Sequence, residues 1–563
     1  MMNRIISQAV STRGTTRRGF LKMSAGAAGG LILGGALLPT AATAQAGPDS
    51  LATPFVHIRP DNTVVVIVKH LDKGQGTATG LATLIADELD ADAAQVTTQF
   101  APANTGLYAN TLLGVQGTGG STAMPNSWQQ YREAGATARA MLVAAAAKTW
   151  GVDPASITVS NGEITDGANK ATLGDMAATA AKQSVPDSVT LKSPDQWVYI
   201  GKSFPRVDVV RKSQGATNMY GMDVAMEGLV YAVSLRSPRF GGVLAGLDAT
   251  EARAMPGVID VIQLPDRATV IAESTWQAIQ ARDALSAEWD FSQAENRGTE
   301  ELRAEYTALL DEEGIAFHSA VVSQADTEQV IEADYSFPYL AHTPMEPIDV
   351  TVRFDGTEAT FWTGSQIQTL DQNIGAQVLG IDPGSVSIET LWGGGSFGRR
   401  AIYDSHYVAE AAMIAKAWLE AHGDARPIKL VWTREDDVRG GYYRPMHMHR
   451  VRAGLDADGN ITSWEQRVVG QGIAIGTAFE QFMVRDGVDA SSVEGLGEHS
   501  AYTIPGWSVD IHHPEVGVPV LWWRSVGHTH TAYVVETMMD ELAEAAGADP
   551  VEFRLRDLTD PRA

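Results

Sequence analysis

The segment LWGGGSFGRR, residues 391–400, places glycines at the spacing G-x-G-x-x-G and follows them with Arg399 and Arg400. Glycines let a ligand approach the backbone closely, and free N–H groups at the start of a helix attract anions. Two adjacent arginines suit a heavily charged ligand. The residue types therefore predict an anion-binding loop.

Two other interpretations compete with an anion site. A nicotinamide dinucleotide also binds this glycine spacing, but its site needs an acidic residue about 20 positions further on. The next predicted strand, PIKLVWTRE, ends near Glu435 and Asp436, about twice as far away. We expect Glu435, Asp436 and Asp437 to form a solvated strand end instead. A tight turn that packs a helix on a sheet is the other alternative.

Two further glycine-rich segments precede predicted helices. KGQGTATG spans residues 73–80, and VQGTGGSTAMP spans residues 115–125. Each alone is an ordinary loop, but three anion-compatible loops in one chain indicate a long ligand held at several points. We therefore expect the loops at 73–80, 116–122 and 393–398 to converge on one cleft.

The elements that must position these loops alternate between strands and helices. Strands are expected within 54–70 and a hairpin within 155–166, and helices over 80–92 and 129–150. Around the third loop, a strand, the loop and a helix over 403–423 follow one another, with Gly423 ending the helix. The pattern predicts an α+β fold with units over 54–195, 196–334 and 335–563.

Composition restricts the classes of function. The chain has 563 residues, a formal net charge of −26 and no cysteine. Such acidity disfavours nucleic acids and anionic membranes as partners. The absence of cysteine excludes disulfides, cysteine-ligated zinc, iron–sulfur clusters and a thiol nucleophile on this chain. Any iron–sulfur centre must therefore lie on another polypeptide.

Residues 1–46 have the features of an export signal. Arg17 and Arg18 precede a short apolar stretch, which ends in the small-x-small sequence Ala44-Gln45-Ala46. This order is typical of the twin-arginine pathway, which exports folded proteins. We expect a periplasmic protein, or one on the periplasmic face of the inner membrane; the alternative is an uncleaved anchor.

Two histidine pairs, His447-x-His449 and His528-x-His530, could bind a metal. Alternate residues of a strand share a face, so such pairs can present two imidazoles together. They leave a metallohydrolase as one alternative function. Polar packing is the competing interpretation of both pairs, and we favour it.

Eight segments in order carry a resemblance to a known family. They are KGQGTATG, QGTGGSTA, RSPRFGG, HTPMEPIDVTV, WTGSQIQT, GGGSFGRR, WTREDDVRGGYYRPM and WWRSVGHTHTAYVVETMMDELA. Through them the chain resembles the molybdopterin-binding large subunit of the xanthine dehydrogenase/aldehyde oxidase family. The closest likeness is to its exported branch of isoquinoline 1-oxidoreductase beta subunits and membrane-associated aldehyde dehydrogenases.

The resemblance implies the multi-domain molybdopterin-binding subunit fold of that family. Residues 54–195 would be a permuted N-terminal part of the molybdopterin-binding domain, and 196–334 an α/β hammerhead-like domain. Residues 335–563 would be the main part of the molybdopterin-binding domain, with its C-terminal portion missing. The cofactor-binding residues that the resemblance implies are Gln75, Gly76, Gly119, Gly120, Ser121, Thr122, Gln366, Gly394, Gly395, Phe397, Gly398 and Arg524.

The resemblance also implies a function. The cofactor would be molybdopterin, as the cytosine dinucleotide, which holds molybdenum without protein ligands. The reaction would hydroxylate an aldehyde or a nitrogen heteroaromatic with water-derived oxygen. Electrons would pass to a separate small [2Fe–2S] subunit and on to a c-type cytochrome subunit.

The family's catalytic glutamate belongs to a stretch beyond residue 563. Neither Glu346 nor Glu536 stands in the matching motif, so no catalytic residue is assigned. An inactive truncated binding or assembly fragment is therefore an alternative to an active enzyme.

Overall fold

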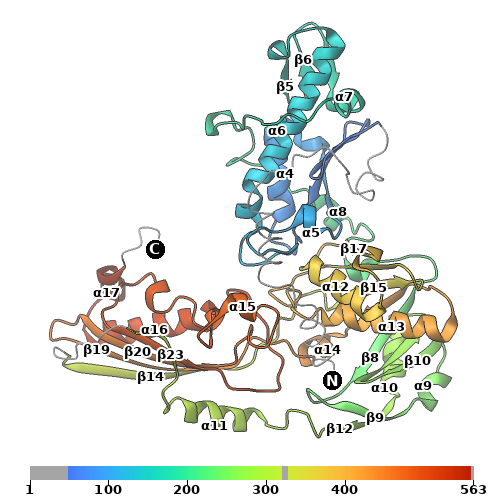
Figure 1. Ribbon diagram of the computed structural model, residues 1–563. Coiled ribbons are helices and arrows are strands. Elements are labelled where there is room, and N and C mark those ends of the chain that lie inside the picture. The colour runs from blue at the N-terminus through green and yellow to red at the C-terminus, as the bar shows by residue number, and fades with distance from the viewer. Residues whose placement is uncertain (1–48, 320–326, 559–563) are drawn as a thin grey trace.

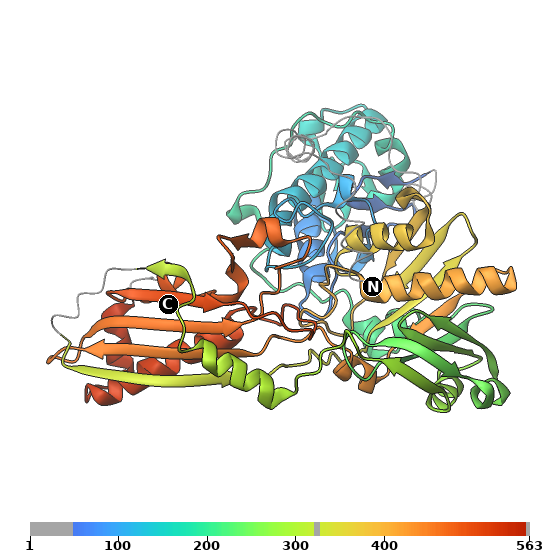
Figure 2. The same ribbon diagram turned by 60° about the horizontal axis from the view of Figure 1, so that its bottom comes forward.

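The computed structural model describes residues 49–319 and 327–558, which form three lobes around a central junction (Figure 1). A second view shows the same three lobes meeting at that junction (Figure 2). The predicted export signal lies outside the described residues. In the described part of the chain, no helix has the length and apolar character needed to cross a membrane.

The first lobe, blue to teal in Figure 1, is built on a four-stranded sheet in the order β1-β2-β3-β4. Its strands are β1 (Leu51–Ala52), β2 (Val56–Ile58), β3 (Val64–Val68) and β4 (Val96–Phe100). The run VVVIV of β3 is buried throughout, as a strand covered on both faces requires. The helices α4 (Thr77–Leu89) and α6 (Ala123–Trp150) pack against each other beside this sheet.

The far end of this lobe is a small three-stranded sheet. Its strands are β5 (Thr158–Ser160), β6 (Glu163–Thr165) and β7 (Lys170–Thr172), and α7 (Leu173–Ala180) follows them. β5 and β6 form the predicted hairpin, turning at Asn161 and Gly162, which both have positive φ. Two short helices, α5 (Thr105–Tyr108) and α8 (Val209–Ser213), complete the lobe.

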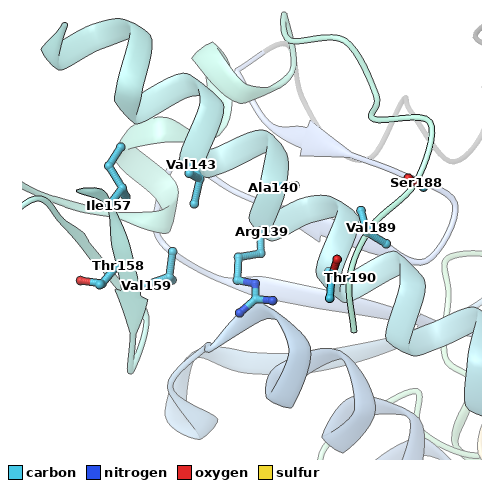
Figure 3. A pocket seen from close by; sticks show the side chains of 10 residues that line it. Arg139, Ala140, Val143, Ile157, Thr158, Val159, Ser188, Val189 and Thr190 are labelled. Carbon is cyan, nitrogen blue, oxygen red and sulfur yellow. The ribbon is translucent and has the colours of Figure 1, made fainter. Parts of the chain in front are cut away.

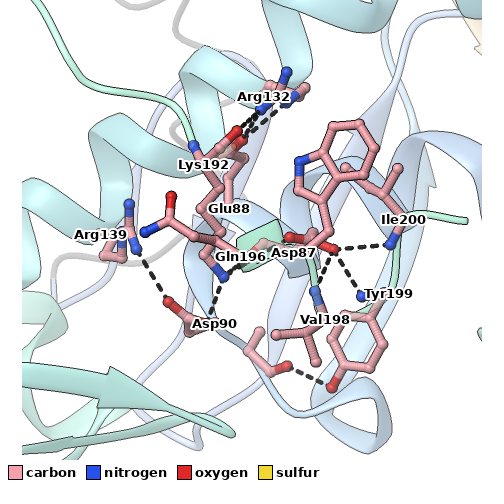
Figure 4. A network of polar contacts seen from close by, with 12 residues as sticks. Asp87, Glu88, Asp90, Arg132, Arg139, Lys192, Gln196, Val198, Tyr199 and Ile200 are labelled. Atoms are coloured by element: carbon pink, nitrogen blue, oxygen red, sulfur yellow. Dashed lines mark hydrogen bonds and ion pairs between the residues drawn. The ribbon is translucent and has the colours of Figure 1, made fainter. Parts of the chain in front are cut away.

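A charged cluster, here called the clasp, ties the segment 190–200 to α4 and α6 (Figure 4). One carboxylate oxygen of Asp87 accepts hydrogen bonds from the backbone N–H groups of residues 198, 199 and 200 at 3.0, 2.7 and 2.8 Å. Glu88 pairs with Arg132 at 2.7 Å. Lys192 pairs with Asp90 at 2.5 Å. The clasp therefore fixes a long connecting segment by hydrogen bonds to buried Asp87 and by an ion pair of Lys192 with partly buried Asp90.

The second lobe, green to orange, is a seven-stranded sheet in the order β10-β11-β8-β18-β15-β16-β17. The strands are β8 (Val230–Arg236), β10 (Val258–Leu264), β11 (Arg267–Ala272), β15 (Asp349–Phe354), β16 (Ala359–Thr363), β17 (Val386–Thr390) and β18 (Ile428–Val431). The helices α12 (Gln368–Leu379) and α13 (His406–His422) pack on it, α13 against β15.

The predicted boundary between residues 334 and 335 does not separate two sheets. β8 pairs in parallel with β18, Val230 opposite Ile428, so strands from both predicted units share one sheet. β8 is flanked by β11 and β18, and its apolar residues are buried in a central position. Around this sheet lie α9 (Thr250–Ala254), α10 (Thr275–Asp283) and the paired strands β9 (Val243–Asp248) and β12 (Ser286–Asp290).

The third lobe is a five-stranded sheet in the order β13-β23-β20-β19-β14. Its strands are β13 (Ile315–Ser319), β14 (Gln329–Phe337), β19 (His447–Leu455), β20 (Ile461–Gly470) and β23 (Trp507–His512). α16 (His528–Ala545) contacts β14 and β19, and its apolar residues join the lobe's core. α11 (Thr299–Leu309), α15 (Glu480–Met483), α17 (Pro550–Asp557) and the short pair β21 (Val484–Arg485) and β22 (Val488–Asp489) complete it.

The segment after β18 corrects one prediction. Residues 435–437 lie in the helix α14 (Arg434–Arg439) instead of a solvated strand end. Thr433 and Asp436 form a capping box, which starts a helix by satisfying its first N–H groups. Asp437 is buried and pairs with Arg434 at 2.7 Å. The acidic run therefore supplies a helix start and a buried charge. The helix α13 ends at Gly423 with φ 70°, as predicted.

Candidate functional site

The three glycine loops converge at the junction of the first and second lobes, as predicted. The N–H group of Gly393 donates to the carbonyl of Asp72 at 3.0 Å, which joins the third loop to the first. The N–H group of Leu71 donates to the Thr118 hydroxyl at 2.9 Å, which joins the first loop to the second. The three loops therefore meet at one place between these lobes, here called the glycine cleft because we expect the ligand to lie there.

Gln366 joins the second and third loops from beneath. Its side-chain amide N–H donates to the Thr118 carbonyl at 2.7 Å, and its amide oxygen accepts from the Ser396 hydroxyl at 2.6 Å. The Thr118 N–H also donates to the Gln366 carbonyl at 2.9 Å. The side chain is buried, and both ends of its amide are used within the protein. In this structure Gln366 therefore sets the spacing of the loops.

Glu346 holds the glycine-rich loop on its other side. Its carboxylate accepts from the Gly394 N–H at 2.7 Å, and its own N–H donates to the Gly394 carbonyl at 3.1 Å. A Cβ atom at Gly394 would lie 2.4 Å from the Glu346 Cβ, so only glycine fits at this position. This contact fixes the backbone of the loop at its centre.

Arg399 and Arg400 do not face a ligand, which corrects the expectation for this pair. Both guanidinium groups are buried, with 1% and 0% of the side chain exposed. Arg400 pairs with Asp349 at 3.1 Å and with Glu346 at 3.3 Å. Arg399 contacts the His406 ring at 2.8 Å. Arg400 supports the loop from behind, because two buried carboxylates take up its charge. Arg399 lies behind the loop as well, and its Nε and Nη2 have no hydrogen-bond partner among the described residues.

Asp349 and Glu346 form a buried acidic pair beneath the loop. Burial and the neighbouring Glu346 raise the pKa of Asp349 to about 8, against the opposite effect of Arg400. Two carboxyl groups this close favour sharing one proton over both being ionised. The raised pKa favours the protonated form of the Asp349 carboxyl beneath the loop.

The end of the glycine loop meets the segment 522–526 of the third lobe. The Arg524 N–H donates to the Phe397 carbonyl at 2.7 Å, while the Phe397 side chain remains 38% exposed. A Cβ at Gly398 would lie 1.8 Å from the Trp522 carbonyl oxygen, and Gly398 has φ +113°. Phe397, Ser525 and Val526 also have positive φ. Such left-handed backbone persists where surrounding contacts enforce it, often at ligand sites.

Several buried polar atoms at this junction have no partner in the described part of the chain. The His342 ring donates from Nε2 to the Trp522 carbonyl at 2.9 Å, which leaves its buried Nδ1 as an unused acceptor. The indole N–H groups of Trp522 and Trp523 are likewise buried and unpaired. Buried polar groups are ordinarily hydrogen-bonded. Unused donors and an acceptor beside a glycine cradle fit a polar bound group.

The first two loops contribute backbone more than side chains. The side-chain amide of Gln75 donates to the Leu71 carbonyl at 2.8 Å and accepts from the Lys73 N–H at 2.8 Å, so it closes its own loop. The Asp72 carboxylate accepts from the N–H groups of Gly74 and Ala78, both at 2.9 Å. The start of α4 is therefore already occupied by an acid, and a ligand anion is not needed there.

The second loop presents an open surface at the start of α6. Gly119 has no atom within 4 Å of an added Cβ, and Gly120 and Ser121 have positive φ and are exposed. The Thr122 hydroxyl donates to the Gly119 carbonyl at 2.7 Å, so it shapes the turn. No side chain caps α6. Gly76 stands at the start of α4 with φ +88°.

Sequence reasoning assigned no role to Lys73 or His342, although both stand in segments that carry the family resemblance. From the sequence, one of Trp522 and Trp523, next to Arg524, is expected to face the substrate. The signal for Lys73 and His342 lies in residue type, because each is a polar, ionisable residue within a resemblance segment. Glu346 was considered and not assigned, and it instead braces the loop.

The histidine pairs form a buried cluster in the third lobe. The rings of His447 and His530 stack with centroids 3.7 Å apart, and His449 donates from Nε2 to Nδ1 of His530 at 2.9 Å. Gln466 donates to Nδ1 of His449 at 3.0 Å. Burial lowers the pKa of His449 to about 3, and it also lowers the pKa values of His447 and His530 well below their usual range. Over the described residues, no group of three acidic or histidine side chains has the arrangement of a metal site.

A surface groove of about 480 Å³ lies elsewhere, on the first lobe (Figure 3). It is lined by α6, β5 and the segment 188–190, with Arg139 pointing toward its floor. Arg139 is paired with Asp90 at 3.1 Å, as part of the clasp. The residues that line it include none from the three glycine loops, so it forms no part of the glycine cleft.

Two protein-family models match this chain. Both describe a molybdopterin cofactor-binding domain, and they match residues 13–226 and 313–558. The first match contains the glycine loops at 73–80 and 116–122, and the second contains the loop at 393–398. The three loops of the cleft thus fall inside the two matched segments.

Relatives of known name extend across the chain. The isoquinoline 1-oxidoreductase subunit beta of Brevundimonas diminuta is 27% identical over 100% of this chain and 77% of its own length. A protein of Gluconacetobacter polyoxogenes named membrane-bound aldehyde dehydrogenase [pyrroloquinoline-quinone] is 28% identical over 97% of this chain and 72% of its own.

Among solved structures, the aldehyde oxidoreductase of Desulfovibrio gigas shares the fold with a TM-score of 0.50 and 19% identity. The match covers 69% of this chain and 47% of that chain, so this chain corresponds to about half of the solved protein. The mixed helices and sheets described above agree with this multi-domain α+β fold. On these matches, the chain belongs to the molybdopterin-binding large subunits of the xanthine dehydrogenase/aldehyde oxidase family.

Proposed function

We propose that the chain is the molybdenum-cofactor subunit of an oxidoreductase that hydroxylates an aldehyde or a nitrogen heteroaromatic. The convergence of three glycine loops on one cleft is the observation that carries this proposal. The names of the relatives, an isoquinoline oxidoreductase and an aldehyde dehydrogenase, support the two substrate classes. The oxygen that enters the product would come from water.

The cofactor would lie against the backbone of the three loops. Gly394, Gly395, Phe397 and Gly398 would contact it from the second lobe, and the segment Gly119–Thr122 from the first. The unpaired Nδ1 of His342 and the indole N–H groups of Trp522 and Trp523 offer an acceptor and two donors at the same junction. When bound, the molybdenum–pterin group would supply the two-electron redox chemistry.

The protein would contribute position and shape. Gln366 and Glu346 hold the loops at fixed spacing, so the backbone N–H groups that face the cleft need no rearrangement on binding. Gln75 acts through its own loop, and Arg524 through the hydrogen bond from its backbone to Phe397. The half-exposed Phe397 ring gives a flat apolar contact for an aromatic or alkyl substrate.

The form of the cofactor is a finer part of the proposal. We infer a molybdopterin cytosine dinucleotide, whose length suits three separated anion-compatible loops. The Gluconacetobacter relative carries pyrroloquinoline quinone in its name, whereas both domain matches name molybdopterin. Extraction of the cofactor separates these two outcomes, because a pterin releases its nucleotide on hydrolysis and a quinone releases none.

The enzyme requires a partner for its electrons. The oxidation yields two electrons, and the 563 residues include no cysteine to hold an iron–sulfur cluster. The Brevundimonas relative is named as subunit beta, which supports a multi-subunit enzyme. We infer a small [2Fe–2S] subunit, a c-type cytochrome subunit as its acceptor, and export to the periplasm by the twin-arginine signal in residues 1–46.

The decisive experiment is purification of the chain with its co-purifying subunits, followed by metal analysis and assay. We expect about one molybdenum per chain, iron only when the partner is present, and oxidation of benzaldehyde or isoquinoline with an artificial electron acceptor. Absence of molybdenum, with zinc in its place, would contradict the proposal. Molybdenum without turnover of either substrate would favour the alternative of a binding or assembly fragment.

A further inference from the structure

At the contact between the first and third glycine loops stands a cation, Lys73, that has no partner in the part of the chain that the structure describes. An added Cβ at Gly393 would lie 3.2 Å from the Cβ of Lys73, so the Lys73 side chain begins directly against the third loop. The N–H group of Lys73 donates to Gln75 at 2.8 Å, and the carbonyl of the preceding Asp72 accepts from Gly393 at 3.0 Å. The backbone of Lys73 is thereby fixed on both sides.

The Lys73 ammonium has no hydrogen bond or ion pair with any residue of the described ranges. The chain has 68 acidic and 42 basic residues, so carboxylates outnumber cations. The nearest acid in sequence, Asp72, has both carboxylate oxygens engaged by the N–H groups of Gly74 and Ala78. A partly buried charge without a counter-ion is costly, and structures rarely retain one without use.

Burial and a nearby base act on the charge of Lys73. Burial and the nearby Arg400 lower the pKa of Lys73 to about 8. Lys73 in turn contributes to the lowered pKa of His342, whose Nδ1 is the unused acceptor of the cleft. The ammonium therefore lies near His342 and near Arg400, which stands behind the third loop, so a negative ligand group would offset the repulsion.

Lys69, in the same lobe, is a lysine whose ammonium has an acceptor for every N–H donor. Its ammonium donates to the Ala109 carbonyl at 3.2 Å and to the side-chain oxygens of Asn126 and Gln130, both at 2.7 Å. These three acceptors match its three N–H donors. Lys69 thus needs no ligand, while Lys73, four residues further on, lacks any such acceptor.

We propose that Lys73 binds an oxyanion in the glycine cleft, either a phosphate of the bound cofactor or a carboxylate of the substrate. The identity of that ligand rests on the proposed function. The sequence predicts that Arg399 and Arg400 bind a negatively charged ligand. Because both arginines contact groups behind the loop, we assign this role to Lys73 instead. A single flexible ammonium can meet an oxyanion without a fixed geometry.

The test compares Lys73→Met, which removes the charge, with Lys73→Arg, which keeps it. Lys182→Met, at an exposed lysine of the first lobe, is the control. If the oxyanion is a cofactor phosphate, Lys73→Met loses bound molybdenum and phosphorus about tenfold or more by metal analysis. If it is a substrate carboxylate, molybdenum stays, and the ratio of kcat/KM for 4-carboxybenzaldehyde over benzaldehyde falls about tenfold or more.

In both arms Lys73→Arg should retain most of the wild-type value and Lys182→Met all of it. Equal molybdenum and an equal substrate ratio in Lys73→Met and wild type would overturn the proposal, as would equal loss in Lys73→Arg and Lys73→Met. Should Lys73→Met fail to fold, Lys73→Gln supplies the neutral variant. If wild type binds no molybdenum, the proposed function fails; inorganic pyrophosphate is then titrated into the metal-free chain, and equal binding by wild type and Lys73→Met overturns the proposal for Lys73.

Discussion

The clasp of the first lobe and the glycine cleft both bury charged side chains, but they treat them differently. In the clasp, each acid faces a base or several N–H groups, and Glu88, Asp90 and Lys192 pair within 3.1 Å (Figure 4). In the cleft, Lys73 has no counter-ion among residues 49–319 and 327–558, and over the same ranges Nδ1 of His342 has no hydrogen-bond partner. Burial and the neighbouring Glu346 also raise the pKa of Asp349 there.

The difference separates a structural network from a binding site. A buried network whose opposite charges are paired fixes one conformation, even though one Asp87 oxygen of the clasp has no hydrogen bond from the described residues. A region that leaves donors, acceptors and charge unused carries a cost in stability, which is tolerated at functional sites. The left-handed backbone at Phe397, Ser525 and Val526 also lies at the glycine cleft. Such strain, like the unused polar groups, is tolerated at functional sites.

Breaking the clasp should have the largest effect on stability. Glu88→Ala leaves the buried Arg132 without its carboxylate, and removing one partner of a buried pair costs about 3–5 kcal/mol. Urea unfolding measures this loss. Glu163→Ala, in the exposed pair with Lys170, should cost less than about 1 kcal/mol. A loss of similar size in both variants would contradict the structural role of the clasp.

Filling the glycine cleft should affect binding more than folding. Gly398→Ala places a Cβ against the Trp522 carbonyl, at a φ that disfavours alanine, so the loop must shift. We expect about 2–3 kcal/mol of lost stability and at least about tenfold less bound molybdenum. Gly380→Ala is the control, since Gly380 has φ +80° with open space, and it should cost about 1 kcal/mol without loss of molybdenum. Retention of molybdenum in Gly398→Ala would place the cofactor elsewhere.

The histidine cluster of the third lobe is a third group of buried side chains, and it should make the free energy of unfolding depend on pH. Because the pKa of each buried imidazole lies below its unfolded value near 6.5, the unfolded chain binds more protons in acid. Stability is then present above pH 6.5 and is lost as the pH falls. Between pH 6.5 and 5.5 we expect a loss of about 1 kcal/mol for each of the three histidines.

Unfolding at pH 5.5 should accordingly take up protons, which calorimetry in two buffers measures. His499→Gln, at an exposed histidine, should leave that uptake unchanged. A release of protons on unfolding would show that the cluster is charged in the folded protein.

The smallest effect is expected at the acid behind the cleft. The pKa of Asp349 is raised to about 8, so its contribution to stability is full below the unfolded value near 3.8 and is lost as the pH rises toward 8. Asp349→Asn resembles the protonated acid, so at pH 7 it should lie within about 1 kcal/mol of wild type. Urea unfolding at pH 5 and 8 should vary less than in wild type. A loss as large as that of Glu88→Ala would contradict the protonated state.

Local structure near the site was predictable from the sequence, while the partners of its charged groups were not. The helix α13 and its end at Gly423 follow from periodicity and a glycine. The convergence of the loops followed from their shared anion-binding character. The burial of Arg400 depends on Asp349 and Glu346, about 50 residues earlier, and no local signal reports such a pairing.

Long-range pairing also explains the shared sheet. β8 and β18 are separated by almost 200 residues, and strand order at that distance is set by burial of both edges. The unpaired state of Lys73 is a further case, because a missing partner is visible only when all neighbours are known. Residue type located the glycine cleft, and three-dimensional neighbours decided which of its charges remain available.

Two loops of the glycine cleft belong to the first lobe and the third belongs to the second lobe. During synthesis of the chain, the two parts of the cleft are therefore formed one after the other. The first lobe has its own core, drawn from residues 51–219 with Trp392 as a later addition. The loop at 393–398 emerges about 170 residues after that core is complete. At roughly 5–20 residues per second, this delay is on the order of ten to thirty seconds. During that interval the nascent chain presents two glycine loops as an open half-site, so a long ligand can reach them before the remaining wall of the cleft exists.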